Sequence, residues 1–232
     1  VKDVIAMKGK KLTASSKILD DFHSLYNATV IERLLQEDAI IIGRCNCDEF
    51  AMGSSNENSA FGPVLNDIDN TRVSGGSSGG SAVAVQAGLC MASLGSETGG
   101  SIRQPASFCG NIGFKPTYGR LSRYGLIAFA SSFDQIGPIT NNVEDMAMIM
   151  EAMAGVDPKD ATSSKHQPQA YASNLKLDRK LKIAYYPQTL DNPKIDPEIS
   201  KSMYALIDKL RAEGHTVEPQ DLKYLDYLVP TY

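Results

Sequence analysis

The stretch Ser74-Gly75-Gly76-Ser77-Ser78-Gly79-Gly80-Ser81 runs directly into Ala82-Val83-Ala84-Val85-Gln86-Ala87-Gly88-Leu89. Glycine and serine alone are typical of a flexible linker. The small apolar residues that follow without a polar spacer argue against that interpretation, because they predict a buried helix that begins at the cluster. Glycine permits close approach of the backbone, and serine at a helix start supplies hydroxyls and exposed amides. We therefore expect a binding or catalytic site at the start of this helix.

The segments on both sides of the cluster alternate between predicted helices and strands. Apolar residues at helical spacing, with Asn or Asp as the N-cap, predict helices over 27–38, 142–155 and 196–214. Short β-branched runs predict strands over 39–43 and 181–185, the first of them buried on both faces. The polar, irregular stretch between Asp157 and Lys180 is expected to be a surface loop. This alternation is typical of an α/β fold.

Composition narrows the classes of protein to which the chain can belong. Apolar residues make up 42% of its 232 residues and charged residues 22%, so a disordered or collagenous chain is excluded. No apolar stretch reaches the roughly 18 residues of a membrane helix. A net charge of -4 argues against a broad nucleic-acid-binding face. Four cysteines are too few for a disulfide framework, which favours a reducing, cytoplasmic setting. The ends at Val1 and Tyr232 suggest a piece of a longer chain.

A second glycine cluster contains a candidate nucleophile. It reads Gly95-Ser96-Glu97-Thr98-Gly99-Gly100-Ser101-Ile102-Arg103-Gln104-Pro105. This cluster has two interpretations. It can be an ordinary tight turn, or Thr98-Gly99-Gly100 before Ser101 can direct successive backbone amides toward one point. Amides arranged in this way stabilise an oxyanion in acyl transfer. Ser101 would then be the nucleophile beside these amides. Phosphate binding is not favoured, because neither G-x-x-x-x-G-K-[ST] nor G-x-G-x-x-G occurs in these clusters.

A nucleophilic serine needs a base, and lysine is the better candidate here. His23, His166 and His215 lie outside any motif-like setting, and G-x-S-x-G does not surround Ser101, so a Ser-His-Asp triad is not favoured. Lys2 is the candidate lysine. To act as a base it must be neutral, and lowering its pKa from about 10.4 to near 7.4 requires about 4 kcal/mol of bias against the charged form. Burial can supply this bias, so the hypothesis requires a buried Lys2.

The cysteines offer alternatives that we consider weaker. Cys109 is a possible thiol nucleophile, but no paired histidine is recognisable, so it is predicted to be a small core residue. Cys45 and Cys47 have the wrong spacing for the usual zinc sites. No metal site is predicted.

The glycine clusters together resemble the signature of a known family. Gly75-Gly76-Ser77-Ser78-Gly79-Gly80-Ser81 and Thr98-Gly99-Gly100-Ser101-Ile102-Arg103 are similar to the amidase signature family, whose members hydrolyse amides with a Ser-Ser-Lys triad. In that family a lysine precedes the first serine by 75 positions and the nucleophile follows it by 24, and Lys2, Ser77 and Ser101 match both intervals. The resemblance implies a mixed β-sheet core covered by α-helices on both faces, a three-layer α/β/α arrangement. Residues 1–232 would form the N-terminal and central part of one such domain.

The resemblance also implies a role for each matching residue. Ser101 corresponds to the acylated nucleophile. Ser77 corresponds to a bridging serine, held by a cis peptide bond, that relays a proton between Ser101 and Lys2. The implied oxyanion hole consists of Thr98, Gly99, Gly100 and the amide of Ser101. The implied substrate-binding positions are Met52, Ser78, Arg103 and Tyr232. Of these, Ser78 and Arg103 are expected to support the triad more than to contact substrate.

Within the family, three further segments resemble the glutaminase components of the tRNA-dependent amidotransferases, known as their A subunits. They are Asp48-Glu49-Phe50-Ala51-Met52-Gly53-Ser54-Ser55, Gly113-Phe114-Lys115-Pro116-Thr117-Tyr118-Gly119-Arg120 and the stretch 124–138. The resemblance implies hydrolysis of glutamine, with a glutamyl ester on Ser101 and release of ammonia. Partner B and C subunits would use the ammonia, with ATP and magnesium, to amidate misacylated Glu-tRNA(Gln) or Asp-tRNA(Asn). No cofactor is then expected in this chain itself.

Two other functions stay open. A stand-alone amidase of the same family would use the same triad on other carboxamides. A non-catalytic assembly module would bind partner subunits without turnover.

Overall fold

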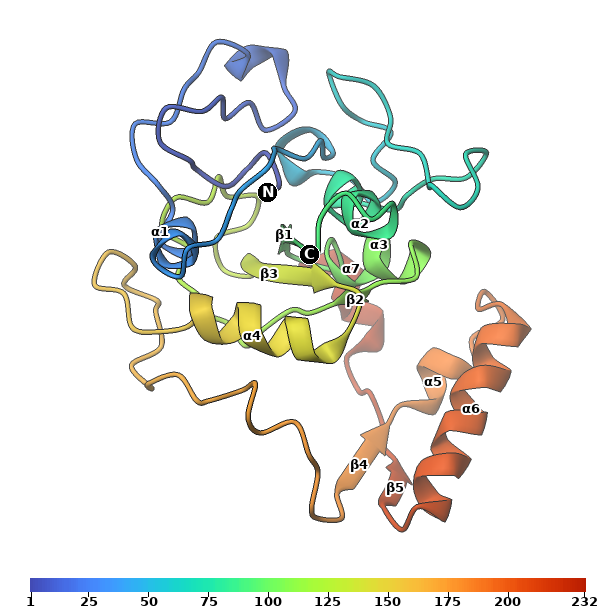
Figure 1. The fold of residues 1–232 in the computed structure, drawn as a ribbon. Coiled ribbons are helices and arrows are strands. Elements are labelled where there is room, and N and C mark those ends of the chain that lie inside the picture. The colour runs from blue at the N-terminus through green and yellow to red at the C-terminus, as the bar shows by residue number, and fades with distance from the viewer. The chain divides into compact units, whose positions relative to one another are not determined.

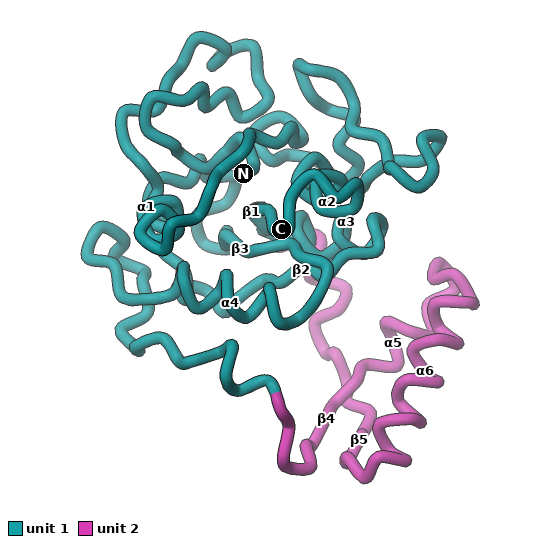
Figure 2. Tube along the Cα trace, in the orientation of Figure 1, with its two compact units in different colours: residues 1–175 teal, residues 176–232 magenta.

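The computed structural model describes residues 1–232, which form two compact units, Val1–Leu175 and Lys176–Tyr232 (Figure 2). The first unit contains η1 (Lys17–Leu19), α1 (Thr29–Gln36), η2 (Glu49–Ala51), α2 (Gly79–Gln86), β1 (Ala92–Glu97), α3 (Arg103–Phe108), β2 (Ile112–Gly113), β3 (Gln135–Thr140) and α4 (Val143–Met153). The second contains β4 (Lys182–Tyr185), α5 (Pro187–Leu190), α6 (Pro197–Ala212), β5 (Thr216–Pro219), η3 (Leu225–Tyr227) and α7 (Leu228–Thr231). That both units belong to a single amidase signature domain stays a prediction.

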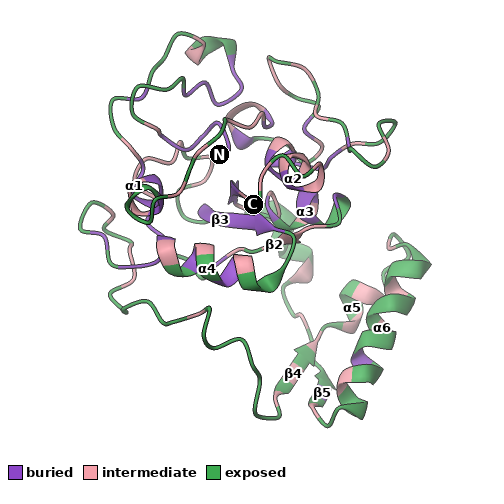
Figure 3. Ribbon diagram, in the orientation of Figure 1, coloured by how far each residue is buried: buried purple, intermediate pink, exposed green.

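The sheet of the first unit separates two layers of helices. Its strands run antiparallel in the order β1-β3-β2, and β3 is buried along its whole length (Figures 1 and 3). Because successive side chains of a strand point to opposite faces, β3 contributes to two cores. Ile136 packs with Met150 and Met153 of α4, whereas Ile139 packs with apolar residues of α2 and α3. Helices therefore cover both faces of this sheet, which confirms the predicted mixed α/β class.

The serine-glycine cluster opens a buried helix, as its sequence predicts. α2 begins at Gly79 and is tied to β1 through two hydroxyls: Ser81 Oγ donates to the carbonyl of Leu94 at 2.9 Å, and Ser93 Oγ donates to that of Ser81 at 2.7 Å. The backbone of this helix lies so close to its neighbours that a Cβ on Gly80 would collide with the carbonyl of Asn46. The small residues of the cluster thus allow α2 to lie directly against the sheet and the Asn46 loop.

The predicted helices 27–38 and 142–155 correspond to α1 and α4. Asn142 caps α4 as expected, since its side chain accepts from the amide of Asp145 at 2.7 Å. The predicted Asn27 cap of α1 is wrong. The side chain of Asn27 accepts instead from the amide of Lys8 at 2.7 Å, and Ala28 takes the cap position without a side-chain hydrogen bond. A contact with a distant segment has replaced the local one.

The predicted buried strand 39–43 is also wrong. No strand forms there, and Ile40 and Ile42 are 89% and 69% exposed. The segment pairs with another part of the chain only further on, in an isolated bridge to the N-terminal residues, where the amide of Cys45 donates to Val1 and the amide of Asp3 donates to Cys45. The preceding residues pair with no strand, so Ile41 packs against the core from a segment without regular structure while Ile40 and Ile42 stay exposed.

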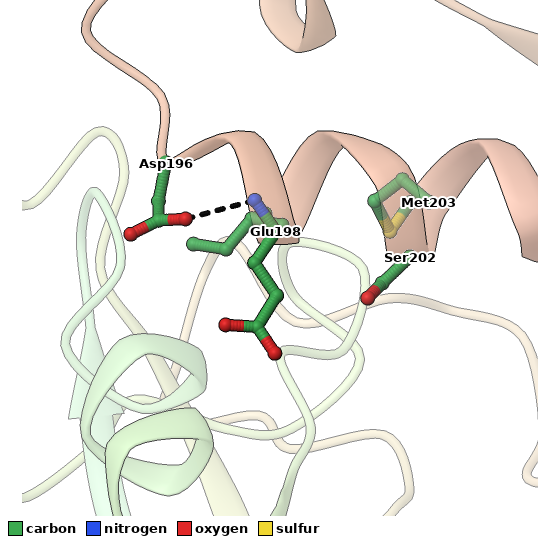
Figure 4. Close-up of a pocket in the computed structure, with 5 residues that line it drawn as sticks. Asp196, Glu198, Ser202 and Met203 are labelled. Atoms are coloured by element: carbon green, nitrogen blue, oxygen red, sulfur yellow. Dashed lines mark hydrogen bonds between the residues drawn. The ribbon is translucent and has the colours of Figure 1, made fainter.

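The second unit is a small parallel β-α-β arrangement. β4 and β5 pair in parallel with Ile183 opposite Val217, and α5 and α6 lie between them in the chain. This confirms the predicted strand and helix. Asp196 caps α6 by accepting from the amide of Glu198 at 2.8 Å, and a shallow pocket lies beside this first turn (Figure 4). In the whole chain, no helix combines the length and apolar character that a membrane crossing needs.

Candidate active site

Lys2 is buried at the centre of the first unit. Its side chain and backbone are 0% exposed, and its amide donates to the carbonyl of Leu94 in β1 at 2.9 Å. The amine Nζ donates to Ser77 Oγ at 2.6 Å and to the carbonyl of Ser96 at 3.3 Å. Lys2 is therefore buried, as its proposed role as a base requires. Its amine contacts Ser77, which lies 75 positions further along the chain.

The environment of Lys2 favours its neutral form. Burial lowers the pKa of the amine from its ordinary 10.5 to about 8, because a charged ammonium loses its hydration there. The carboxylates of Asp48, Asp134 and Glu97 oppose this effect and keep the pKa from falling further. The Cys47 thiol acts in the same direction only when it is ionised, and burial raises its own pKa. With a pKa near 8, an appreciable share of the protein carries a neutral amine at physiological pH. That amine is able to accept a proton from a neighbouring hydroxyl.

Ser77 is held from both sides by backbone contacts. The Gly76–Ser77 peptide bond is cis, as the family resemblance implies. The carbonyl of Ser77 accepts from the amide of Asp48 at 3.2 Å, and the amide of Gly76 donates to the side chain of Gln104 at 2.9 Å. These contacts place Ser77 Oγ against Lys2 Nζ.

Ser101 lies at the end of a turn, residues 98–101, that we call the oxyanion turn. It connects β1 to α3, and its amides at Thr98, Gly99, Gly100 and Ser101 donate to no acceptor within the protein. The carbonyl of Ser101 accepts from the amide of Ser78 at 3.0 Å, which brings the two glycine clusters together. The Ser101 hydroxyl makes no hydrogen bond to Ser77. Four free amides beside a free hydroxyl suit the stabilisation of an oxyanion next to a nucleophile.

The other predicted site residues lie in different settings. Ser78 is buried, and its hydroxyl is occupied by the carbonyl and amide of Ser96 at 3.1 and 3.3 Å. The guanidinium of Arg103 pairs with the buried carboxylate of Glu97. Both arrangements fit a supporting role. Met52 is half-exposed after η2, and Tyr232 is an exposed residue of the second unit, so their contact with substrate stays a prediction.

Three carboxylates around the site were missed by the sequence analysis. Glu97 accepts from the amides of Ile102 and Arg103, both at 2.9 Å, and so holds the far end of the oxyanion turn. Asp48 and Asp134, on two other segments, lie near enough to raise the pKa of Lys2. The available signal was that Glu97, Asp48 and Asp134 each lie inside a segment already quoted for its motif or its resemblance to the family.

The remaining nucleophile and base candidates are not placed for catalysis. Cys109 is buried in the core between α2 and α3, as predicted, and its thiol points to the carbonyl of Ser74 at 3.5 Å. Burial raises the pKa of this thiol to about 11, which suppresses the reactive thiolate. His23 and His166 are exposed, and neither histidine contacts Ser101. Cys47 is hydrogen-bonded to Ser15 at 3.2 Å in a buried position.

A buried serine–lysine contact beside a turn of free amides defines a candidate site for acyl transfer. The Amidase family matches this chain over residues 1–232, and the chain belongs to that family. Over 100% of its own length, it is 53% identical to the A subunit of glutamyl-tRNA(Gln) amidotransferase from Chlorobium phaeobacteroides and 54% identical to the one from Chlorobium luteolum. It spans about half of these relatives, 49% and 48%.

Solved structures show the same fold. The crystal structure of the glutamyl-tRNA(Gln) amidotransferase A subunit from Thermotoga maritima matches 100% of this chain and 51% of its own, with a TM-score of 0.92 and 44% identity. The peptide amidase of Stenotrophomonas maltophilia matches 99% of this chain and 48% of its own, with a TM-score of 0.83 and 30% identity. The three-layer α/β fold is therefore shared with amidases of more than one specificity.

Proposed function

We propose that this chain is the catalytic part of a glutamine amidohydrolase subunit in a tRNA-dependent amidotransferase. The observation that carries the proposal is the 2.6 Å contact of the buried Lys2 amine with Ser77, next to the free amides of the oxyanion turn. The names of the similar proteins favour glutamine as the amide donor and Glu-tRNA(Gln) as the final acceptor.

The reaction begins with a proton transfer through two hydroxyls. The Ser101 hydroxyl turns toward Ser77 and passes its proton to Ser77 Oγ, while Ser77 gives its own proton to the neutral Lys2 amine. Ser101 Oγ then attacks the carboxamide carbon of glutamine, and the carbonyl oxygen becomes an oxyanion within reach of the turn's amides. Lys2 has become an ammonium at this stage.

Collapse of the intermediate releases ammonia. The proton on Lys2 returns through Ser77 to the amide nitrogen, the carbon–nitrogen bond breaks, and a glutamyl ester remains on Ser101. A water molecule, deprotonated along the same path, hydrolyses the ester to glutamate and restores the Ser101 hydroxyl. The neutral lysine is thus consumed and regenerated twice in each cycle.

The ammonia would serve B and C partner subunits in the cytoplasm. They would use ATP and magnesium to activate misacylated Glu-tRNA(Gln) and convert it to Gln-tRNA(Gln), and this chain would contribute no cofactor. The names of the similar proteins support this assignment.

The test is ammonia release from glutamine by the full-length protein, compared with its Ser101→Ala variant. We expect release by the wild type and none above the uncatalysed rate by the variant. Equal traces would refute the proposed chemistry and return the chain to the class of assembly modules. A panel of other carboxamides distinguishes the second candidate, a stand-alone amidase, which the shared fold of the peptide amidase favours. Turnover of these amides without glutamine would support that second function.

A further inference from the structure

The first residue of the oxyanion turn is bound by a buried carboxylate that the proposed reaction does not use. Asp134 is 3% exposed and directly precedes β3, whose first residue, Gln135, pairs with Glu97 at the end of β1. This register places Asp134 opposite Thr98. Thr98 Oγ1 donates to Asp134 Oδ1 at 2.5 Å. The start of the turn is therefore fastened across the sheet by one side-chain hydrogen bond.

Asp134 is itself fixed independently of Thr98. The amides of Phe129 and Ala130 donate to its Oδ2 at 2.9 and 3.0 Å, and that of Ala130 also donates to Oδ1 at 3.2 Å. A carboxylate that accepts two backbone amides has a defined orientation before the threonine hydroxyl binds. Asp134 is thus an anchor for the turn.

The turn has few other restraints near its start. Its four amides donate to no protein acceptor, and Gly99 and Gly100 carry no side chain that would pack. The far end is held by the carboxylate of Glu97 through the amides of Ile102 and Arg103. The amides of Gln104 and Ser78 also donate to the carbonyls of Gly100 and Ser101 there. At the near end the pairing of β1 with β3 stops at Glu97, and the hydroxyl of Thr98 supplies the next restraint.

We propose that Asp134 is a positioning residue for amide hydrolysis, which orients the oxyanion turn through the hydroxyl of Thr98. The inference rests on the proposed function, since it assumes that the free amides of the turn bind the developing oxyanion. Amides placed in advance stabilise that charge without reorganisation during the reaction. Asp134 does not contact the substrate in this account, and it acts through the geometry of residues 98–101.

The charge of Asp134 supports a second readout. Asp134 is one of three carboxylates that raise the pKa of the Lys2 amine against the effect of burial; the others are Asp48 and Glu97, the latter paired with Arg103. The neighbouring Cys47 thiol contributes only when it is ionised, and burial raises its own pKa. Removal of the Asp134 charge, with the other two carboxylates in place, should lower the pKa of Lys2. A residue that only stabilised the fold would not move the pH dependence of the reaction.

The chain offers a matched control for the hydrogen bond. Thr29, at the start of α1, donates through Oγ1 to the buried carboxylate of Asp157, also at 2.5 Å, and neither residue belongs to the candidate site. Thr98→Val and Thr29→Val each remove a hydroxyl from a buried aspartate and keep the shape of the side chain. Both are expected to lower the melting temperature by a similar amount.

The experiment compares kcat and KM for glutamine hydrolysis by these full-length variants. We expect Thr98→Val to lower kcat about ten- to hundredfold with a smaller change in KM, because misplacement of catalytic donors by about 1 Å has effects of this size. Thr29→Val should stay within about twofold of the wild type in kcat. Thr98→Ser, which keeps the hydroxyl, should recover most of the turnover that Thr98→Val loses.

The aspartates provide the second comparison. Asp134→Asn should shift the acidic limb of the pH profile of kcat/KM to lower pH, whereas Asp157→Asn should leave the limb unmoved. Equal kcat values for Thr98→Val and Thr29→Val would overturn the positioning role, whether or not Asp134→Asn folds. Absence of wild-type, Ser101-dependent ammonia release would instead refute the proposed function, so the two failures are distinguishable.

Discussion

The pKa of Lys2 predicts a specific effect of pH on stability. A fall from 10.5 to about 8 on folding corresponds to about 3 kcal/mol in favour of the neutral amine. Between pH 8 and 10.5 the amine is protonated in more of the unfolded chains than of the folded ones. The free energy of unfolding therefore rises as the pH increases through this window, and this gain is lost as the pH falls to 8. The size of this component follows from the complete burial of the amine.

Lys2→Met isolates this component. The methionine keeps an apolar side chain of similar length but carries no titratable group, so its own stability lacks the contribution. We expect the unfolding free energy of the wild type, minus that of the variant, to increase by about 2 kcal/mol between pH 7.5 and 10. The variant also loses the hydrogen bonds of the amine to Ser77 and to the carbonyl of Ser96. This loss changes the difference in unfolding free energy by an amount that depends little on pH.

Urea denaturation of both full-length proteins across this pH range provides the measurement. Lys8→Met is the control, because Lys8 is exposed and its amine keeps its hydration on folding. Its difference from the wild type should stay constant with pH. Parallel curves for Lys2→Met and the wild type would refute the reasoning, since they would show that folding does not change the proton affinity of Lys2. The same pKa predicts that wild-type kcat/KM at pH 7 is about one tenth of its plateau above pH 9.

Other predictions concern packing and local structure. Gly76→Ala should lower the unfolding free energy by about 2 kcal/mol or more and reduce glutamine hydrolysis, because its Cβ would collide with the Asp48 carboxylate. Gly43→Ala, where a Cβ meets no atom within 4 Å, is the control in the same denaturation and activity assays. Cys109→Ser should leave hydrolysis within about twofold of the wild type, and iodoacetamide at pH 8 should label the native wild-type residue slowly, since burial raises the pKa of its thiol to about 11. Rapid labelling, or loss of activity, would contradict this interpretation. Asn142→Ala should cost about 1 kcal/mol in denaturation through loss of the α4 cap, and an unchanged midpoint would show that the cap contributes nothing.

Much of the fold was predictable because its signals are local. The caps Asn142 and Asp196 serve the amides of the next few residues, so their types and spacing indicate the starts of α4 and α6 directly. The apolar run after the serine-glycine cluster predicted α2 in the same way. At 39–43 the β-branched residues indicated a strand, but a strand also needs a neighbour, and none lies beside Ile40 and Ile42. The prediction that Asn27 caps α1 was wrong for a similar reason, because its side chain accepts from the distant amide of Lys8 instead.

The amino-acid sequence by itself determined which residues are available for the chemistry: two glycine clusters, the serines within them and a lysine at a recognisable interval. The tertiary structure decided that the lysine is buried against Ser77, and that the carboxylate of Asp134 meets Thr98 across the sheet. Hydrogen-bond partners 36 and 75 positions apart are brought together by strand register and by the packing of α2 on β1. The pKa of Lys2 depends on the same arrangement, because desolvation is a property of the surroundings that the folded chain creates and no residue carries alone.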